Sequence, residues 1–179
     1  MIVFLDACVL FPTVMREMIV GAANSGAFQI QYSPRVLEEW ARAARRLGDM
    51  GEMQARAEIA LLRSAFPKAE VTPKQGLDRR LWLPDDNDIH VLAAAITGSA
   101  DAIMTSNTKD FPKHILADEG LDRVDPDGFL VRIQQTHPEA MADVGARVLH
   151  QARQMSGPDW SIRTLMKKAR LPRLGKALS

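Results

Sequence analysis

The sequence holds very little cysteine, few aromatic residues and no long apolar run, and each scarcity excludes a class of protein. Cys8 is the single cysteine among 179 residues, so no disulfide can form within the chain, and we expect a protein of the reducing cytoplasm. No apolar stretch approaches the ~20 residues that a membrane-spanning helix needs, so we expect no membrane partner. With three Trp and one Tyr, a module that reads RNA by stacking many bases is not expected.

Several catalytic motifs are also missing. There is no GxxxxGK[ST] or GxGxxG loop to bind nucleotide phosphates and no GxSxG nucleophile turn. The four histidines are scattered and never form HExxH, which argues against zinc catalysis. Chemistry at this protein's site therefore has to come from other side chains.

Charge is unevenly distributed along the chain, although the formal net charge is only +1. Residues 78–127 contain eleven acids against five Lys/Arg, whereas residues 161–179 contain six Lys/Arg and no acid. This pattern predicts a negatively charged site and a separate surface for an anionic partner. Two ordinary solvated faces would produce the same pattern.

Strand patterns and helix patterns alternate along the first part of the chain. Strands are expected at residues 2–11, 27–32, 69–71, 101–106 and 122–124. Helices are expected at residues 12–24, 33–47, 52–65, 87–97 and 125–135. This alternation predicts an α/β fold of three layers, with a central, mostly parallel sheet flanked by helices. After His137 only helical patterns follow, so we predict a domain over residues 1–136 and a helical C-terminal extension over residues 137–179.

Acidic residues recur where strands lead into helices. Asp6 lies near the carboxyl end of the first strand among apolar neighbours, and no Lys or Arg is close in sequence. A buried carboxylate is costly unless it is paired, so Asp6 either caps the following helix or faces a metal ion. Asp85, Asp86 and Asp88 lie at the start of the helix predicted at residues 87–97. Because one of the first two can cap it, Asp88 is in excess.

Two further segments add oxygen-bearing side chains. Glu38 and Glu39 lie early in the helix that Ser33 caps, where the helix dipole alone would favour them. Asn107 and Asp110 follow a strand, where they could also make a turn or cap the next segment. Carboxylates gathered at one edge of a sheet repel one another unless a cation neutralises them. Oxygen ligands suit Mg²⁺ or Mn²⁺, which assist phosphoryl chemistry.

Four segments, in this order, resemble the PIN domain family of metal-dependent ribonucleases: "FLDACVL", "SPRVLEEW", "DNDIHVLAAAI" and "ADAIMTSNTKDFP". The resemblance covers roughly residues 1–132. Within the family it is greatest to the VapC-type toxins of type II toxin–antitoxin pairs. It implies a Mg²⁺- or Mn²⁺-dependent endoribonuclease that hydrolyses RNA phosphodiester bonds, a cognate antitoxin protein as partner, and a homodimer.

The resemblance also assigns roles to individual residues. It implies that Asp6, Asp88 and Asp110 bind the metal and that Glu39 assists in catalysis. The family's fourth acid falls on Asn107, which makes Asp110 the substitute, although Asn107 could still bind the ion through its carbonyl group or a water molecule. Glu38 remains an alternative to its neighbour. Because of this departure, a catalytically weak PIN-fold protein that binds RNA or a protein partner is the alternative function.

Two other Mg²⁺-dependent folds fit less well. A receiver domain would place an acid pair before its acceptor strand, but no acid precedes Asp6. A phosphatase of the haloacid dehalogenase type would need an Asp-X-Asp motif, whereas Cys8 occupies its second position. The basic residues of 161–179 either contact RNA phosphates or form a solvated helix face.

Overall fold

The computed structural model describes residues 1–179, and the chain packs into two compact units. The sheet unit comprises Met1–Phe11 and Gln29–Val124, and the helical unit comprises Pro12–Phe28 and Asp125–Ser179. This is a division by packing and does not test the predicted boundary between residues 136 and 137, which stays a prediction.

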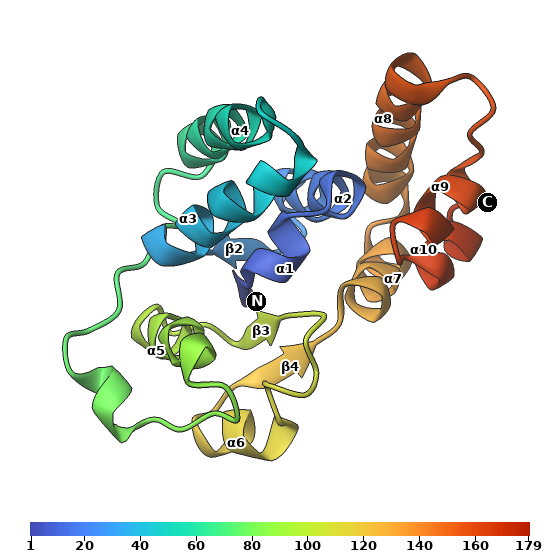
Figure 1. The fold of residues 1–179 in the computed structure, drawn as a ribbon. Coiled ribbons are helices and arrows are strands. Elements are labelled where there is room, and N and C mark those ends of the chain that lie inside the picture. Colours follow the sequence, from blue (N-terminus) through green and yellow to red (C-terminus); the bar gives the residue numbers. More distant parts are fainter. The chain divides into compact units, whose positions relative to one another are not determined.

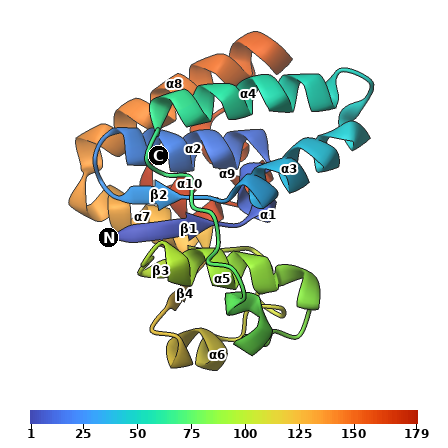
Figure 2. The same ribbon diagram turned by 90° about the vertical axis from the view of Figure 1, so that its left-hand side faces the viewer.

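A four-stranded parallel sheet forms the centre of the sheet unit. Its strands are β1 (Ile2–Leu5), β2 (Gln29–Gln31), β3 (Ala102–Met104) and β4 (Asp122–Val124), in the spatial order β2-β1-β3-β4. Figure 1 shows β3 beside β4, and Figure 2 shows β1 beside β2. Every residue of β3 is buried, as expected for a strand covered on both faces. The predicted α/β class with a parallel sheet flanked by helices is confirmed.

The first strand is shorter than the apolar pattern predicted. It ends at Leu5 instead of continuing to Phe11, and the short helix α1 (Ala7–Leu10) follows with Asp6 at its N-cap position. Val9 and Leu10 of this helix are buried. A continuous apolar run does not distinguish a buried strand from a buried helical turn. The predicted strand at residues 69–71 is reduced to one parallel bridge between Tyr32 and Glu70.

The helices of the sheet unit follow the predicted caps more closely. The Ser33 hydroxyl accepts a hydrogen bond from the Val36 backbone N–H at 3.2 Å, with Pro34 at the first helical position. The helix expected at residues 87–97 begins with a 3₁₀ turn, and one further helix, α6, was not predicted. The elements are α3 (Pro34–Ala43), η1 (Ala44–Leu47), α4 (Gly51–Ala65), η2 (Leu77–Arg80), η3 (Asp86–Asp88), α5 (Ile89–Thr97) and α6 (Lys113–Asp118).

The helical unit consists only of helices. They are α2 (Thr13–Asn24), α7 (Pro126–Thr136), α8 (Pro138–Ser156), α9 (Ile162–Lys168) and α10 (Pro172–Ala177). The buried Asp127 carboxylate of α7 accepts hydrogen bonds from the backbone N–H groups of Arg173 at 3.0 Å and Leu174 at 2.9 Å, so it caps α10. None of the helices combines the length and the apolar character that crossing a lipid bilayer requires.

The contact between α2 and α8 depends on Gly21. A Cβ atom at this position would lie 2.5 Å from Val144 Cγ1, and Val144 is itself buried. We expect Gly21→Ala to reduce the free energy of unfolding by about 1–3 kcal/mol, the usual cost of overpacking. Urea denaturation measures this. The double variant with Val144→Ala should be more stable than the sum of the two single effects predicts, and simple additivity would contradict the proposed clash.

Candidate active site

Asp6 and Thr105 meet at the carboxyl edge of the sheet, directly after the neighbouring strands β1 and β3. The Thr105 hydroxyl donates a hydrogen bond to Asp6 Oδ2 at 2.8 Å, and the Cys8 thiol donates another to the same oxygen at 3.0 Å. Thr105 is fully buried and Asp6 is only 6 % exposed. No Lys or Arg forms an ion pair with this carboxylate. A buried carboxylate held by neutral donors alone favours a cation nearby.

The position of this pair in the sheet is where a ligand is expected. The chain goes from β1 to β2 on one side and later returns through β3 on the other side of β1. Open α/β sheets bind their ligands at such a reversal of strand order, outside the carboxyl ends of the strands. The side chains that follow β1 and β3 therefore line the expected crevice.

Three more carboxylates gather in the sheet unit. One carboxylate oxygen from each of Asp85, Asp88 and Asp110 lies within 4.8 Å of the other two. Asp85 and Asp88 come from the two ends of the 3₁₀ turn η3, and Asp110 comes from the loop after β3. Asp85 also accepts a hydrogen bond from the Asn87 backbone N–H at 2.9 Å, so it caps the turn while its carboxylate remains in the cluster.

The charge of Asp88 is disfavoured in this position. Burial raises the pKa of its carboxyl group most, and the neighbouring carboxylates of Asp6, Asp85 and Asp110 raise it further, against a lowering by His90. The resulting pKa is about 6, compared with an ordinary value of 3.8. Of the three neighbouring carboxylates, that of Asp6 raises the pKa of Asp88 most. The charge of Asp6 therefore acts on the same site, although its oxygens are not among those of the three-acid cluster.

Asn107 and Asp110 form a connected pair in the loop after β3. Asn107 Nδ2 donates a hydrogen bond to Asp110 Oδ2 at 2.5 Å, and its backbone N–H donates to the Thr105 hydroxyl at 2.9 Å. Asp110 does not cap the following helix, because Pro112 occupies the N-cap position of α6 and no side chain caps it. Asn107 thus connects Asp110, through its side-chain amide, to the Thr105–Asp6 pair, through its backbone N–H.

The two neighbouring glutamates have different surroundings. Glu39 Oε1 lies 2.9 Å from Nε2 of His90 on α5 and 3.2 Å from Nε of Arg35. Burial acts to raise the pKa of Glu39, but His90 and Arg35 outweigh it and the pKa is lowered. Glu38 is paired with Arg56 and Arg42 in an exposed ion-pair network, and hydrogen bonds from these two arginines lower its pKa to about 2. Glu39 is therefore the one that approaches the helix carrying Asp88.

Cys8 is not suited to nucleophilic chemistry. Burial, the Asp6 charge and the hydrogen bond to Asp6 raise the pKa of its thiol to about 12. The thiolate is the reactive form of cysteine, and it is almost absent at neutral pH. The contribution of Cys8 is instead to the hydrogen bonding of Asp6, together with the Ser106 backbone N–H that donates to its sulfur at 3.3 Å.

The donor set fits a hard divalent cation. All candidate ligand atoms are carboxylate or amide oxygens, and three carboxylates are close enough to share one ion. Burial first, and then the neighbouring carboxylates, disfavour the charge of Asp88, which a cation would offset. Mg²⁺ and Mn²⁺ prefer such ligands and usually retain several water molecules. Ordinary capping explains Asp85 but not the convergence of all three.

The sequence reasoning missed two members of this site. Asp85 was treated only as a capping residue, although the Asp-X-X-Asp spacing with Asp88 places both at the ends of one turn. Thr105 falls within the strand predicted at residues 101–106 and was given no role in the site. The sequence offers only one indication of a role for Thr105, which is its position two residues before Asn107. That its hydroxyl group bridges two strand ends is visible only in the tertiary structure.

Comparison with known families supports the same interpretation. A family model described as "PIN domain" matches residues 2–109, which is more than half of the chain. The chain belongs to the PIN domain family. PIN domains are in general metal-dependent nucleases, and the matched region contains Asp6, Asp85 and Asp88. Neither the comparison with curated proteins nor the comparison with solved structures found a match.

Proposed function

We propose that this PIN domain protein is an endoribonuclease that hydrolyses RNA phosphodiester bonds with Mg²⁺ or Mn²⁺. The observation that carries the proposal is the gathering of Asp85, Asp88 and Asp110, with the Asp6 charge acting on Asp88, in a chain whose residues 2–109 match the PIN domain family. Three converging carboxylates, with the unpaired charge of Asp6 acting on the same site, favour a bound cation.

The VapC-type resemblance extends the proposal to biological role. We infer that the protein is the toxin of a toxin–antitoxin pair, that it acts in the cytoplasm, that a cognate antitoxin protein binds it, and that it forms a homodimer. The four sequence segments that resemble VapC-type toxins support these inferences. The proposed catalytic role does not depend on them, because it rests on the acidic cluster and on the PIN family match.

Each acid has a distinct assignment in this proposal. Asp85, Asp88 and Asp110 lie close enough together to hold one ion. The family resemblance adds Asp6 as a further ligand, and its charge acts on Asp88. When bound, a divalent ion lowers the pKa of a ligated water and offsets negative charge on the phosphate oxygens. Asn107 orients Asp110 through the 2.5 Å hydrogen bond from its amide group.

Glu39 is assigned to the attacking water. Its lowered pKa keeps the carboxylate ionised at neutral pH, because His90 and Arg35 compensate for its burial. An ionised carboxylate can accept a hydrogen bond from water and take up its proton as the water attacks phosphorus. Glu38 is not assigned a role, because its partners Arg42 and Arg56 lie on α3 and α4, whereas Glu39 contacts His90 on α5.

Asp6→Asn tests the proposed reaction. We expect purified protein to cleave structured RNA with Mn²⁺ and to stop when a chelator is added. We expect Asp6→Asn to cleave at least about 100-fold more slowly, because the charge nearest the strand ends is removed. The matched control is Asp118→Asn at the exposed end of α6, which should retain wild-type activity.

Two results would count against the proposal. Equal cleavage by wild type and Asp6→Asn, unaffected by chelator, would indicate a contaminating nuclease. RNA binding without cleavage at any Mn²⁺ concentration would favour the alternative, a catalytically weak PIN-fold binding protein. In that case Asn107 in place of the family's fourth acid would be the first residue to replace by Asp.

A further inference from the structure

The Lys and Arg side chains of segment 161–179 have no acidic partners, unlike most arginines of the sheet unit. In the sheet unit, most arginines form ion pairs with glutamates, including Arg42–Glu38, Arg45–Glu52, Arg56–Glu52, Arg63–Glu70 and Arg80–Glu119. Within residues 161–179, all six cations are exposed and form no ion pair: Arg163, Lys167, Lys168, Arg170, Arg173 and Lys176. Unpaired cations at this density repel one another and favour a polyanionic partner.

Packing between α9 and α10 brings these cations into one region. The helices lie side by side (the red segments of Figure 1) and approach closely at Gly175, where a Cβ atom would lie 2.9 Å from Met166 Cβ and 3.3 Å from the Arg163 carbonyl oxygen. Leu165, Met166 and Leu174 are buried. Asp127 of the adjoining helix α7 is already used to cap α10, and Asp125 caps α7 through the Gly128 backbone N–H. The cations therefore occupy the exposed side of a pair of helices whose apolar side is buried.

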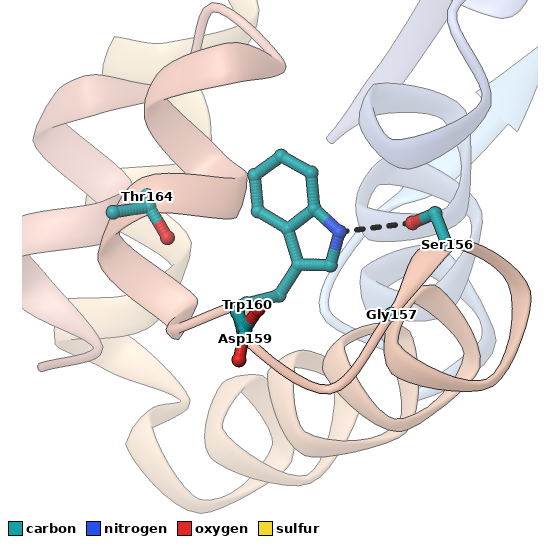
Figure 3. A pocket seen from close by; sticks show the side chains of 5 residues that line it. All are labelled: Ser156, Gly157, Asp159, Trp160 and Thr164. Carbon is teal, nitrogen blue, oxygen red and sulfur yellow. Dashed lines mark hydrogen bonds between the residues drawn. The ribbon is translucent and has the colours of Figure 1, made fainter.

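An aromatic hollow adjoins this basic surface. Ser156, Gly157, Asp159, Trp160 and Thr164 line a hollow of about 300 Å³ between the end of α8 and the start of α9, as Figure 3 shows. The Trp160 indole N–H donates to the Ser156 hydroxyl at 2.9 Å, which fixes the ring. Lys168 Nζ lies 5.0 Å from the ring centroid. A fixed indole with a cation beside it is the combination that binds a base together with its phosphate.

We propose that the exposed side of α9 and α10, together with the Trp160 hollow, binds single-stranded RNA. The cations contact phosphates, and the indole of Trp160 stacks on a base. The inference rests on the proposed function, for which it supplies a substrate-binding surface in the helical unit. An acidic protein segment would pair with the cations but would offer no base to stack on the indole.

Removing charges from this surface tests the phosphate contacts. Binding of a fluorescein-labelled uridine-rich 20-nucleotide RNA is measured by anisotropy in chelator, so that no cleavage occurs, at several salt concentrations. The test variant combines Arg163→Gln, Lys167→Gln and Lys176→Gln. The control removes three exposed cations of the sheet unit by Lys68→Gln, Lys74→Gln and Arg79→Gln. We expect the test variant to bind at least about tenfold more weakly, and the slope of log K against log salt to fall by about 2. We expect the control to match wild type.

Replacing the tryptophan tests base stacking separately. Trp160→Leu should weaken binding about tenfold without changing the salt slope, because a stacking contact involves no counterion. The control is Trp82→Leu, which changes an exposed tryptophan of the sheet unit. Thermal melting by circular dichroism confirms that each variant remains folded.

The outcomes separate this inference from the proposed function. If the protein cleaves RNA with Mn²⁺ but the test and control variants bind alike, the surface inference fails and the ribonuclease stands. If the test variant loses binding as expected but no cleavage is ever seen, the surface stands and the ribonuclease fails. Competition by polyglutamate as strong as by unlabelled RNA would show a general polyanion or protein site and would overturn the inference.

Discussion

Replacing Asp88 by asparagine is expected to reduce RNA cleavage at least about 100-fold and yet to make the metal-free protein more stable at pH 7.5. The loss of activity follows from removing a proposed metal ligand at the three-acid cluster. The gain in stability follows from removing a carboxylate whose charge is disfavoured by burial and by Asp6, Asp85 and Asp110. A residue with a purely structural role would not change the two properties in opposite directions.

The pH dependence of this gain has a definite sign. Because the folded-state pKa of Asp88 is about 6 and the ordinary value is 3.8, the folded protein holds the proton more tightly than the unfolded chain. The cost to stability is absent below pH 3.8, develops between pH 3.8 and 6, and is complete above pH 6. The asparagine variant should therefore gain about 1 kcal/mol at pH 7.5, after allowance for solvent screening of a half-buried group, and little at pH 4.

Thermal melting in chelator measures this gain, as a rise in Tm of roughly 2–4 °C at pH 7.5 for a chain of this size. The matched control is Asp86→Asn, which changes an exposed acid in the same turn outside the cluster and should leave both activity and Tm near wild type. Destabilisation of the Asp88 variant by more than about 2 kcal/mol would show a structural role. Mn²⁺ should raise the Tm of wild type more than that of the Asp88 variant, because ligand binding stabilises the folded state.

Replacing Thr105 by valine is expected to destabilise the protein by about 2–4 kcal/mol. This is opposite in sign to the effect of Asp88→Asn on stability. Valine keeps the shape but removes the hydroxyl group that donates to the buried Asp6 carboxylate and accepts from the Asn107 backbone N–H. Two losses account for this magnitude: the hydrogen bond to the charged Asp6 carboxylate, and the acceptor for the Asn107 backbone N–H, which is left unpaired. Mn²⁺ affinity should fall as well, because Asp6 and the Asn107–Asp110 pair would no longer share an anchor.

Urea denaturation and calorimetric titration with Mn²⁺ measure the two effects of the Thr105 substitution. Thr105→Ser is the control, since it retains the hydroxyl group and should keep most of the metal affinity. Equal stability of the valine and serine variants would mean that the hydroxyl bridge between the strand ends contributes little. Loss of metal affinity in the serine variant as well would show that the buried methyl group, which only serine lacks, is needed in addition to the hydroxyl group.

Elements with explicit caps were predicted well, and elements defined only by apolar content were not. Ser33 and Pro34 marked the start of α3, and both occupy the predicted positions. The first strand was overextended, because the apolar residues after Asp6 continue the core in helical form. The short helix α6 was missed, since its six residues carry too few apolar positions for a helical period to be visible.

The site was predicted as a set of acids from several segments, but its internal connections were not. The positions of Asp6, Asp88 and Asp110 after strands or at a helix start predict a shared edge of the sheet. Nothing in the sequence shows that one amide hydrogen bond joins Asn107 to Asp110, or that Glu39 turns toward His90 while Glu38 turns toward Arg56. Side chains one residue apart on a helix differ in direction by about 100°, so their partners depend on what packs against each face.

The sequence by itself determined the parallel α/β class, the family and the identity of the acids near the carboxyl edge of the sheet, because these depend on local periodicity and on residue order. Only the tertiary structure decided that Thr105 joins the ends of β1 and β3 through Asp6. It also decided that Asp85, expected only to cap the helix at residues 87–97, belongs to the acidic cluster. The raised pKa of Asp88 was decided there too. Each depends on the distance between groups remote in sequence, and folding alone sets that distance.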